Sequence, residues 1–233
     1  MSDPRQRLIV ALDVSTAAAA RKIVAAVGDS AFTYKVGMQL YTAEGPAIVR
    51  ELVASGRRVF LDLKYHDIPN TVGAAVREAT KLGVSMLTVH ASGGGKMLRA
   101  AVDAAGSQPS SPLVLAVTVL TSLDATDLES QGVRGTVEDQ VLRLAAMALS
   151  NGCRGIVASA HEAASLRAEL GLDFIIVTPG VRPAGSGHAD QVRVVTPEEA
   201  VKSGASHIVV GRPITEAPDP AAEAKAILGQ LAG

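Results

Sequence analysis

Short apolar runs of β type alternate along the whole chain with longer Ala- and Leu-rich segments of helical spacing. There are eight such runs: Leu8–Leu12, Thr33–Val36, Val59–Leu63, Met86–Val89, Leu113–Val119, Gly155–Ala158, Phe174–Thr178 and His207–Val210. Most segments between them end at a glycine in the position of a left-handed helix cap: Gly28, Gly56, Gly83, Gly106, Gly152, Gly171 and Gly204. Strands separated by helices pair in parallel, so this repeat predicts an eight-stranded parallel (β/α)8 barrel, a TIM barrel.

The length of the chain fits one such barrel. With 233 residues it lies in the range of single β/α barrels, and no Pro-, Gly- or Ser-rich linker separates regions of different composition. The polar segment 122–137 reads as an insertion after the fifth run. Residues are 48% hydrophobic but only 3% aromatic, which indicates a core of small aliphatic side chains. We expect one catalytic domain over residues 1–233.

Charge and cysteine content exclude several classes of protein. The net charge of −1 provides no basic field for nucleic acid or an anionic membrane. No apolar run is long enough to span a membrane, and the polar N-terminus does not resemble a signal peptide. The single cysteine, Cys153, forms no internal disulfide and no metal or redox motif. These features favour a cytoplasmic protein with a small-molecule ligand.

The segment Asp62-Leu63-Lys64-Tyr65-His66-Asp67-Ile68-Pro69-Asn70-Thr71 concentrates charge directly after a β-type run. Side chains alternate across a strand, so Asp62 and Lys64 should leave it on one face, with Asp67 following in the loop. Burying charges is costly unless they are paired. The segment is therefore a candidate active site.

Polar residues follow most of the other runs as well. A single one would be read as a surface ion pair or turn residue, but barrel enzymes place catalysis at the carboxyl ends of their strands, and the coincidence favours function. The residues are Asp13 after the first run, Lys35 in the second, Asp62 and Lys64 at the third, Thr121 and Ser122 after the fifth, Arg182 after the seventh, and Gly211 and Arg212 after the eighth.

The loops after the seventh and eighth strands commonly bind phosphate in barrels. Gly211 would allow close approach of the backbone, and the Arg212 guanidinium would hold phosphate oxygens. Arg182 and Gln191 flank a Gly-rich stretch that we expect to be a mobile loop closing over the same anion. The sequence thus predicts a phosphorylated substrate. As alternatives to phosphate binding, Arg212 could pair with Glu216, and Gln191 could simply be solvated.

Three further signals are weak. Gly93-Gly94-Gly95-Lys96 lacks the spacing of a Walker loop and is expected to be a flexible loop that opens the fourth helix. His66 and His90 could approach Asp67, but no His/Cys spacing typical of a metal site supports them as ligands, so no metal is expected. No GxSxG elbow is present, which leaves serine hydrolase chemistry without support.

The ten-residue charged segment resembles the signature of the orotidine 5′-phosphate decarboxylase family. Tyr65 stands where the family more often has Phe. Further matches to the bacterial branch run in order along the whole chain: Ala11-Leu12-Asp13, Tyr34-Lys35-Val36-Gly37, Val117-Thr118-Val119-Leu120-Thr121-Ser122, Thr178-Pro179-Gly180-Val181-Arg182-Pro183, Asp190-Gln191 and Val210-Gly211-Arg212.

This resemblance implies decarboxylation of orotidine 5′-phosphate to UMP and CO2 by a homodimer with shared active sites and no cofactor. Lys64 would be the proton donor, and Asp62 would face the substrate carboxylate. The remaining implied roles are ribose binding by Lys35 and Asp13, entry into the partner's site by Asp67, Ile68 and Thr71, pyrimidine contacts by Thr121 and Ser122, and phosphate binding by Gln191, Gly211, Arg212 and Arg182.

Two alternatives remain open on the sequence. A Mg²⁺-dependent phosphosugar barrel, such as a 3-keto-gulonate-phosphate decarboxylase or a hexulose-phosphate synthase, shares the Asp-x-Lys-x-x-Asp core but has a carboxylate where Lys35 stands here. A ribulose-phosphate epimerase is disfavoured, because its His-x-Asp at the second strand is absent. A non-catalytic barrel that binds a phosphate ligand would not need the intact charge array.

Overall fold

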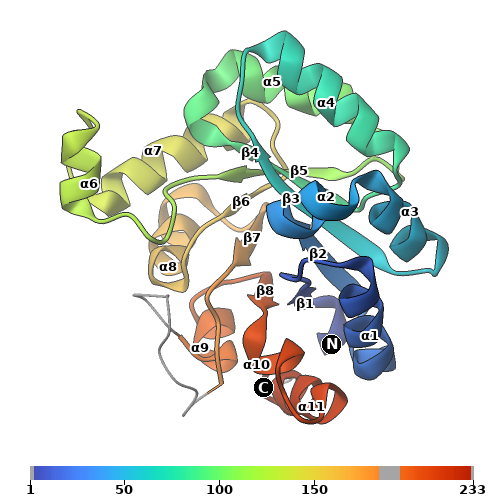
Figure 1. The fold of residues 1–233 in the computed structure, drawn as a ribbon. Coiled ribbons are helices and arrows are strands. Elements are labelled where there is room, and N and C mark those ends of the chain that lie inside the picture. Colours follow the sequence, from blue (N-terminus) through green and yellow to red (C-terminus); the bar gives the residue numbers. More distant parts are fainter. Residues whose placement is uncertain (1–2, 184–194, 232–233) are drawn as a thin grey trace.

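The computed structural model describes residues 3–183 and 195–231, and these form a closed parallel barrel surrounded by helices (Figure 1). Each strand pairs with the next in sequence, and β8 pairs with β1. The strands are β1 (Leu8–Ala11), β2 (Thr33–Gly37), β3 (Arg58–Tyr65), β4 (Met86–His90), β5 (Leu113–Val117), β6 (Gly155–Val157), β7 (Ile175–Thr178) and β8 (His207–Val210). The predicted barrel and its eight strands are confirmed.

Helices connect the strands and cover the outside of the barrel (Figure 1). They are α1 (Ala17–Val27), α2 (Met38–Glu44), α3 (Pro46–Ala54), α4 (Pro69–Lys81), α5 (Gly94–Ala105), α6 (Ala125–Ser130), α7 (Val137–Ser150), α8 (Ala160–Leu170), α9 (Pro197–Lys202), α10 (Arg212–Thr215) and α11 (Pro220–Leu231), with 3-10 turns at Pro4–Gln6, Gly28–Ser30 and Ala91–Gly93. No helix among the described residues is long and apolar enough to cross a membrane.

The predicted glycine caps adopt the backbone conformation that requires glycine. Gly106 and Gly171, for example, have φ of 82° and 85° and close α5 and α8 through a backbone hydrogen bond to the preceding turn. The polar insertion is not a plain loop, because it contains α6, which starts at a reciprocal capping box between Asp124 and Asp127.

Alternation along the strands builds two separate apolar clusters. Outward residues such as Leu8 and Val10 pack with the helices in the larger cluster. The inward cluster is small and consists of Ile9, Ala11, Phe60, Met86, Leu115, Val177 and Val209. Gly155 of β6 allows close approach of β7, since a Cβ there would lie 2.8 Å from the Cβ of Ile175. The inward cluster fills the barrel beneath the carboxyl ends of the strands and leaves the space above it open.

One strand departs from regular geometry. β3 runs beyond the predicted end at Leu63 to Tyr65, and its pairing with β4 shifts register between Leu61 and Tyr65. Within this stretch Lys64 has φ of 51°, and it is the one non-glycine residue of the described chain with positive φ. Such a conformation costs an L-residue about 1–2 kcal/mol. The strain falls on a residue of the charged segment.

Candidate active site

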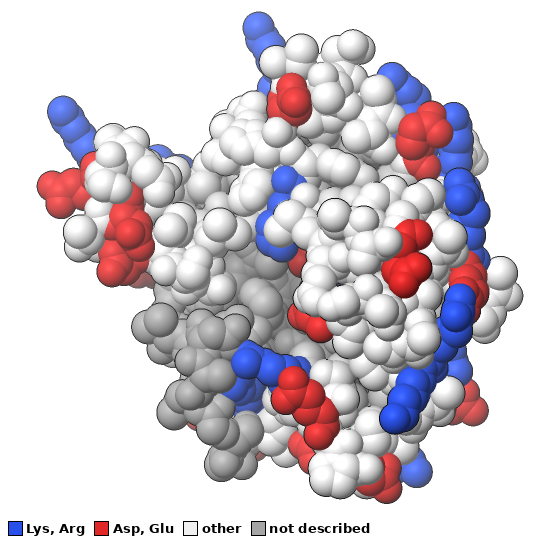
Figure 2. All heavy atoms as spheres, viewed as in Figure 1, with Lys and Arg blue, Asp and Glu red and all other residues white. Residues whose placement is uncertain are grey.

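A cavity of about 580 Å³ opens at the carboxyl ends of the strands. Its lining includes residues from β1, β2, β3, β5, β6, β7 and β8 and from the segments that follow them. In the space-filling view the mouth is a hollow with both acidic and basic side chains along it (Figure 2). The cavity lies where β/α barrels carry their functional groups.

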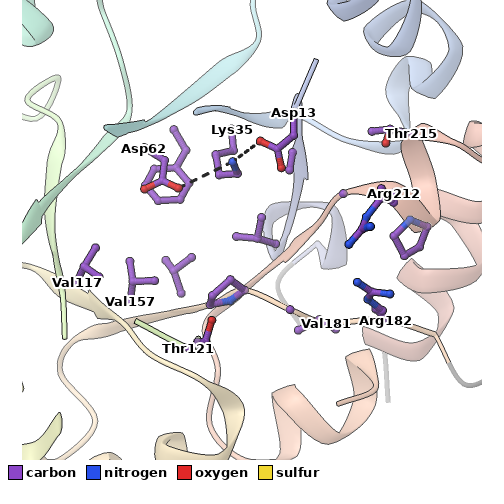
Figure 3. Close-up of a pocket in the computed structure, with 18 of the residues that line it drawn as sticks. Asp13, Lys35, Asp62, Val117, Thr121, Val157, Val181, Arg182, Arg212 and Thr215 are labelled. Carbon is purple, nitrogen blue, oxygen red and sulfur yellow. Dashed lines mark hydrogen bonds and ion pairs between the residues drawn. The ribbon is translucent and has the colours of Figure 1, made fainter. Parts of the chain in front are cut away.

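Four charged side chains in or just after the first three strands line this cavity and are here called the charge cluster: Asp13, Lys35, Asp62 and Lys64. Figure 3 shows Asp13, Lys35 and Asp62 side by side. The Lys35 Nζ lies 2.7 Å from the Asp13 Oδ1 and 3.9 Å from the Asp62 Oδ2. The Lys64 Nζ lies 3.0 Å from both carboxylate oxygens of Asp62. The side chain of Asp62 is only 14% exposed and that of Lys35 12%, whereas Asp13 is 56% exposed.

The alternating signs of the four charges stabilise the charge cluster. Each carboxylate has an ammonium within 3.0 Å, and Asp62 lies between two of them. At an effective dielectric of 20, a pair separated by 3.0 Å attracts by about 5.5 kcal/mol, which offsets much of the cost of desolvation. Gly37 leaves room for the Lys35–Asp13 contact, since a Cβ there would lie 2.9 Å from the Lys35 Nζ.

The floor of the cavity is apolar. The cavity lining includes Val117, Val157, Val177, Val209 and Phe60, and each is buried or partly buried. Figure 3 shows Val117 and Val157 next to each other. Aliphatic walls exclude water and lower the local dielectric, so charges at their edge act more strongly than they would in solvent. The arrangement places an apolar surface next to the charge cluster.

The opposite wall carries two guanidinium groups. Arg182 and Arg212 lie across the cavity from Asp62, on the segments that follow β7 and β8 (Figure 3). Arg182 is 8% exposed, and its backbone N–H donates to the Val195 carbonyl at 3.0 Å. Gly211 lines the same wall, and a Cβ on it would lie 3.9 Å from the Asp13 Oδ2. This wall suits an anionic group held at a distance from Asp62 and Lys64.

Several predicted site residues do not line this cavity. Asp67 is exposed, and its Oδ1 accepts a hydrogen bond from the Ile68 N–H at 2.6 Å. Ile68 is 65% exposed, and Thr71 and Ser122 are exposed as well. Thr121, by contrast, lines the cavity. Gln191 and most of the predicted loop 182–191 lie outside the described residues.

The residues of the weaker sequence signals do not line the cavity at the carboxyl ends of the strands. The rings of His66 and His90 lie 5.4 Å apart, and burial, with smaller contributions from His66 and Lys64, lowers the pKa of His90. No group of three or more His, Cys, Asp or Glu side chains among the described residues could hold a metal ion. Gly94 and the two residues after it open α5 as an ordinary helix. Burial raises the pKa of the Cys153 thiol to about 12, which is unsuitable for a nucleophile.

Sequence reasoning missed one polar residue that contacts the charge cluster. The hydroxyl of Thr88 in β4 donates to the Asp62 Oδ1 at 3.0 Å and accepts from the backbone N–H of Lys64 at 2.9 Å. Thr88 is fully buried. In sequence it is one residue within an apolar strand, and only its alternation with Met86 could have placed it on the inner face.

Comparison with known proteins gives a consistent result. The model of the Orotidine 5'-phosphate decarboxylase / HUMPS family matches residues 6–227. Orotidine 5′-phosphate decarboxylase of Anaeromyxobacter sp. (strain K) is 53% identical over 98% of this chain and 99% of its own length, and that of Moorella thermoacetica is 50% identical over 97% and 92%. The crystal structure of the decarboxylase from Lactobacillus acidophilus superposes with a TM-score of 0.87 at 41% identity, covering 97% of this chain and 99% of that one.

Proposed function

The chain belongs to the orotidine 5′-phosphate decarboxylase / HUMPS family, and on this premise we propose how its cavity converts orotidine 5′-phosphate to UMP and CO2. The family expectation from the sequence is confirmed, and the chain is a carboxy-lyase. The observation that supports an assignment of roles is the contrast between the two walls. One carries Asp62 and Lys64 in ion-pair contact, and the other carries Arg212 beside Gly211.

Lys64 is proposed as the proton donor. Loss of CO2 from carbon 6 of the pyrimidine leaves an electron pair in the plane of the ring, where the π system cannot delocalise it. Stabilisation must then be electrostatic, and an ammonium held in a dry, preorganised site supplies it most effectively. The same ammonium delivers the proton that completes UMP. The apolar valines beside Lys64 support this role.

Asp62 is proposed to face the substrate carboxylate. Two like charges about 4 Å apart repel by roughly 4 kcal/mol at an effective dielectric of 20. Departure of neutral CO2 relieves this repulsion, whereas the attraction between Lys64 and the developing carbanion grows. Asp62 also holds the Lys64 ammonium in place, because both of its oxygens lie 3.0 Å from the Nζ.

The remaining polar residues are proposed to hold the nucleotide. Lys35 and Asp13 form a 2.7 Å pair at the mouth, where ribose hydroxyls can bind both a donor and an acceptor. Thr121, with Ser122 next to it, would contact the pyrimidine. Arg212, Gly211 and Arg182 would bind the phosphate. Gln191 is proposed for the same group on family resemblance alone.

Binding of the distant phosphate contributes to catalysis under this proposal. The arginine wall lies across the cavity from Asp62, the ion-pair partner of Lys64, so it is not placed to act on the reacting carbon directly (Figure 3). Its binding energy instead fixes the ring against the charge cluster and excludes water. Removing a phosphate contact should therefore change both kcat and KM.

We further propose that two subunits share their active sites. Asp67, Ile68 and Thr71 are exposed and do not line the cavity described above, which agrees with a role in the site of a partner. Met38, which directly follows β2, is also exposed, at 55%. Exposed apolar side chains of this kind favour association.

Complementation tests the shared site. Homodimers of Lys64→Ala and of Asp67→Ala should each be inactive. A mixed dimer contains one site with an intact Lys64 and with the intact Asp67 of the partner subunit, so refolding the two variants together should restore activity. Heterodimers that form without recovering activity would mean that Asp67 acts in its own chain.

The Mg²⁺-dependent phosphosugar barrels are the second candidate, and Lys35 argues against them. Its ammonium occupies the end of β2, 2.7 Å from Asp13 and 3.9 Å from Asp62, where it would repel a divalent cation. The two candidates are separated by assaying the protein on orotidine 5′-phosphate in the presence of EDTA. Undiminished turnover is expected, and activity only on a phosphosugar with Mg²⁺ would overturn the proposal.

A further inference from the structure

The irregular pairing between β3 and β4 leaves one residue of β4 opposite three of β3. Leu61 pairs with Leu87 and Tyr65 with Val89, so Thr88 alone faces residues 62–64. A bulge of this kind disrupts the ladder and removes the regular partners of its backbone groups. The N–H of Lys64 thus needs a partner that is not a β4 carbonyl.

The hydroxyl of Thr88 is that partner. It accepts the hydrogen bond of the Lys64 N–H at 2.9 Å and donates to the Asp62 Oδ1 at 3.0 Å. A hydroxyl combines one donor with acceptor lone pairs, so a single side chain can satisfy both contacts. Thr88 is fully buried and does not line the cavity, which excludes direct contact with substrate.

These two contacts act on the two residues whose geometry matters most. Lys64 has φ of 51°, a conformation that an L-residue keeps only when its surroundings hold it. The acceptor at its N–H favours this conformation, and the conformation sets where the Lys64 side chain begins. The donor at Asp62 Oδ1 fixes the carboxylate that holds the ammonium. Because threonine is branched at Cβ, rotation about its χ1 is restricted, which limits the positions that the Thr88 hydroxyl can take.

We infer that Thr88 is a positioning residue, which aligns the Lys64 ammonium and the Asp62 carboxylate through one hydroxyl bound to both. The inference rests on the roles proposed above for those two residues. It goes beyond them by assigning the alignment to a buried residue on the neighbouring strand. A displacement of about 1 Å in a catalytic group can lower a rate by roughly 100-fold.

Two comparisons test the hydroxyl of Thr88: the Val variant against the unmodified enzyme, and the Ala variant against the Ser variant. Thr88→Val keeps the shape and loses the hydroxyl, and Thr88→Ser keeps the hydroxyl in a smaller side chain. Thr88→Ala is the partner of the Ser variant and provides the same comparison if the Val variant does not fold. Thr118→Val is the control, because Thr118 is also buried but donates to the Val157 carbonyl, away from Asp62 and Lys64.

The expected result is a split between turnover and binding. Thr88→Val and Thr88→Ala should lower kcat for orotidine 5′-phosphate roughly 10- to 100-fold, while KM and the affinity for UMP change less than about 3-fold. Thr88→Ser should return kcat to within about 3-fold of the unmodified enzyme. Thr118→Val should lose thermal stability without this loss of kcat.

Three other results would contradict either the proposed function or the inference about Thr88. If the unmodified protein does not decarboxylate orotidine 5′-phosphate, the proposed function itself fails. If it does, and the Val and Ser variants turn over alike, the hydroxyl has no positioning role. A loss shared equally between kcat and UMP affinity would likewise overturn the inference, since it would report a general distortion of the cavity.

Discussion

Replacing Lys64 with alanine removes the ammonium that lies 3.0 Å from both oxygens of Asp62. A cation that reaches a carboxylate at this distance can reach an adjacent carbanion at a similar one. At an effective dielectric of 20 the lost attraction is about 5.5 kcal/mol, which corresponds to roughly four powers of ten in rate. Loss of the proton donor adds to this, so kcat should fall by at least about 10⁴-fold.

The same change should separate substrate binding from product binding. Under the proposed roles, Asp62 of the variant would face the substrate carboxylate with no ammonium beside it except Lys35 at 3.9 Å, so orotidine 5′-phosphate should bind more weakly. UMP has no carboxylate at carbon 6 and keeps its phosphate and ribose contacts. Its dissociation constant should therefore stay within about 10-fold of that of the unmodified enzyme.

Release of CO2 from carboxyl-labelled substrate measures turnover, and calorimetric titration with UMP measures binding. Lys81→Ala is the matched control, because Lys81 is an exposed lysine paired with Glu78 on α4, outside the cavity. It should leave both quantities unchanged. A Lys64→Ala enzyme with kcat reduced less than about 10-fold would refute the assignment of the proton donor.

Three further predictions concern other parts of the barrel. Arg212→Ala should lower kcat/KM for orotidine 5′-phosphate roughly 10- to 100-fold and leave the slow reaction of phosphate-free orotidine unchanged; an equal loss on both substrates would exclude a phosphate contact. Burial, helped by nearby arginines, lowers the pKa of His207 to about 4, below its unfolded value of 6.5, so the folded protein should lose up to about 3 kcal/mol of stability as the pH falls from about 6.5 to 4. Urea unfolding across this range should find the loss reduced in His207→Gln but not in a variant of the exposed His161. Gly155→Ala should destabilise by about 1–3 kcal/mol because its methyl group would press on β7, whereas Gly229→Ala in α11, where a Cβ meets nothing within 4 Å, should not.

The parts of the fold that repeat could be predicted from sequence. The strands are largely buried, and each of the seven segments between successive strands has a glycine after its last helical turn, so local patterns such as Gly83 before Met86 indicate the architecture. The insertion was harder, because α6 is short and depends on the capping box at Asp124 rather than on an apolar period. That the chain is one catalytic domain over residues 1–233 in the cytoplasm stays a prediction.

Some residues of the candidate site could be predicted from the sequence, and others could not. Asp13 and Lys35 line the cavity, as expected from their positions at the carboxyl ends of predicted barrel strands. The extension of β3 to Tyr65 and the positive φ of Lys64 could not be predicted, because a register shift depends on how β4 pairs with β3. The residue pattern within one segment does not show which side chains on another strand will bind to it. For this reason the contacts of Thr88 with Asp62 and Lys64 were not predicted.

The left-handed backbone at Lys64 has a practical consequence for anyone who wishes to make this enzyme more robust. Methods that raise stability replace residues whose backbone is unfavourable, and glycine or asparagine suits this position better than lysine does. Such a procedure would select against the side chain that we propose as the proton donor, and on that proposal it would yield a well-folded protein without activity. A search for thermostable variants should therefore hold position 64 constant and seek its gains among the outer helices.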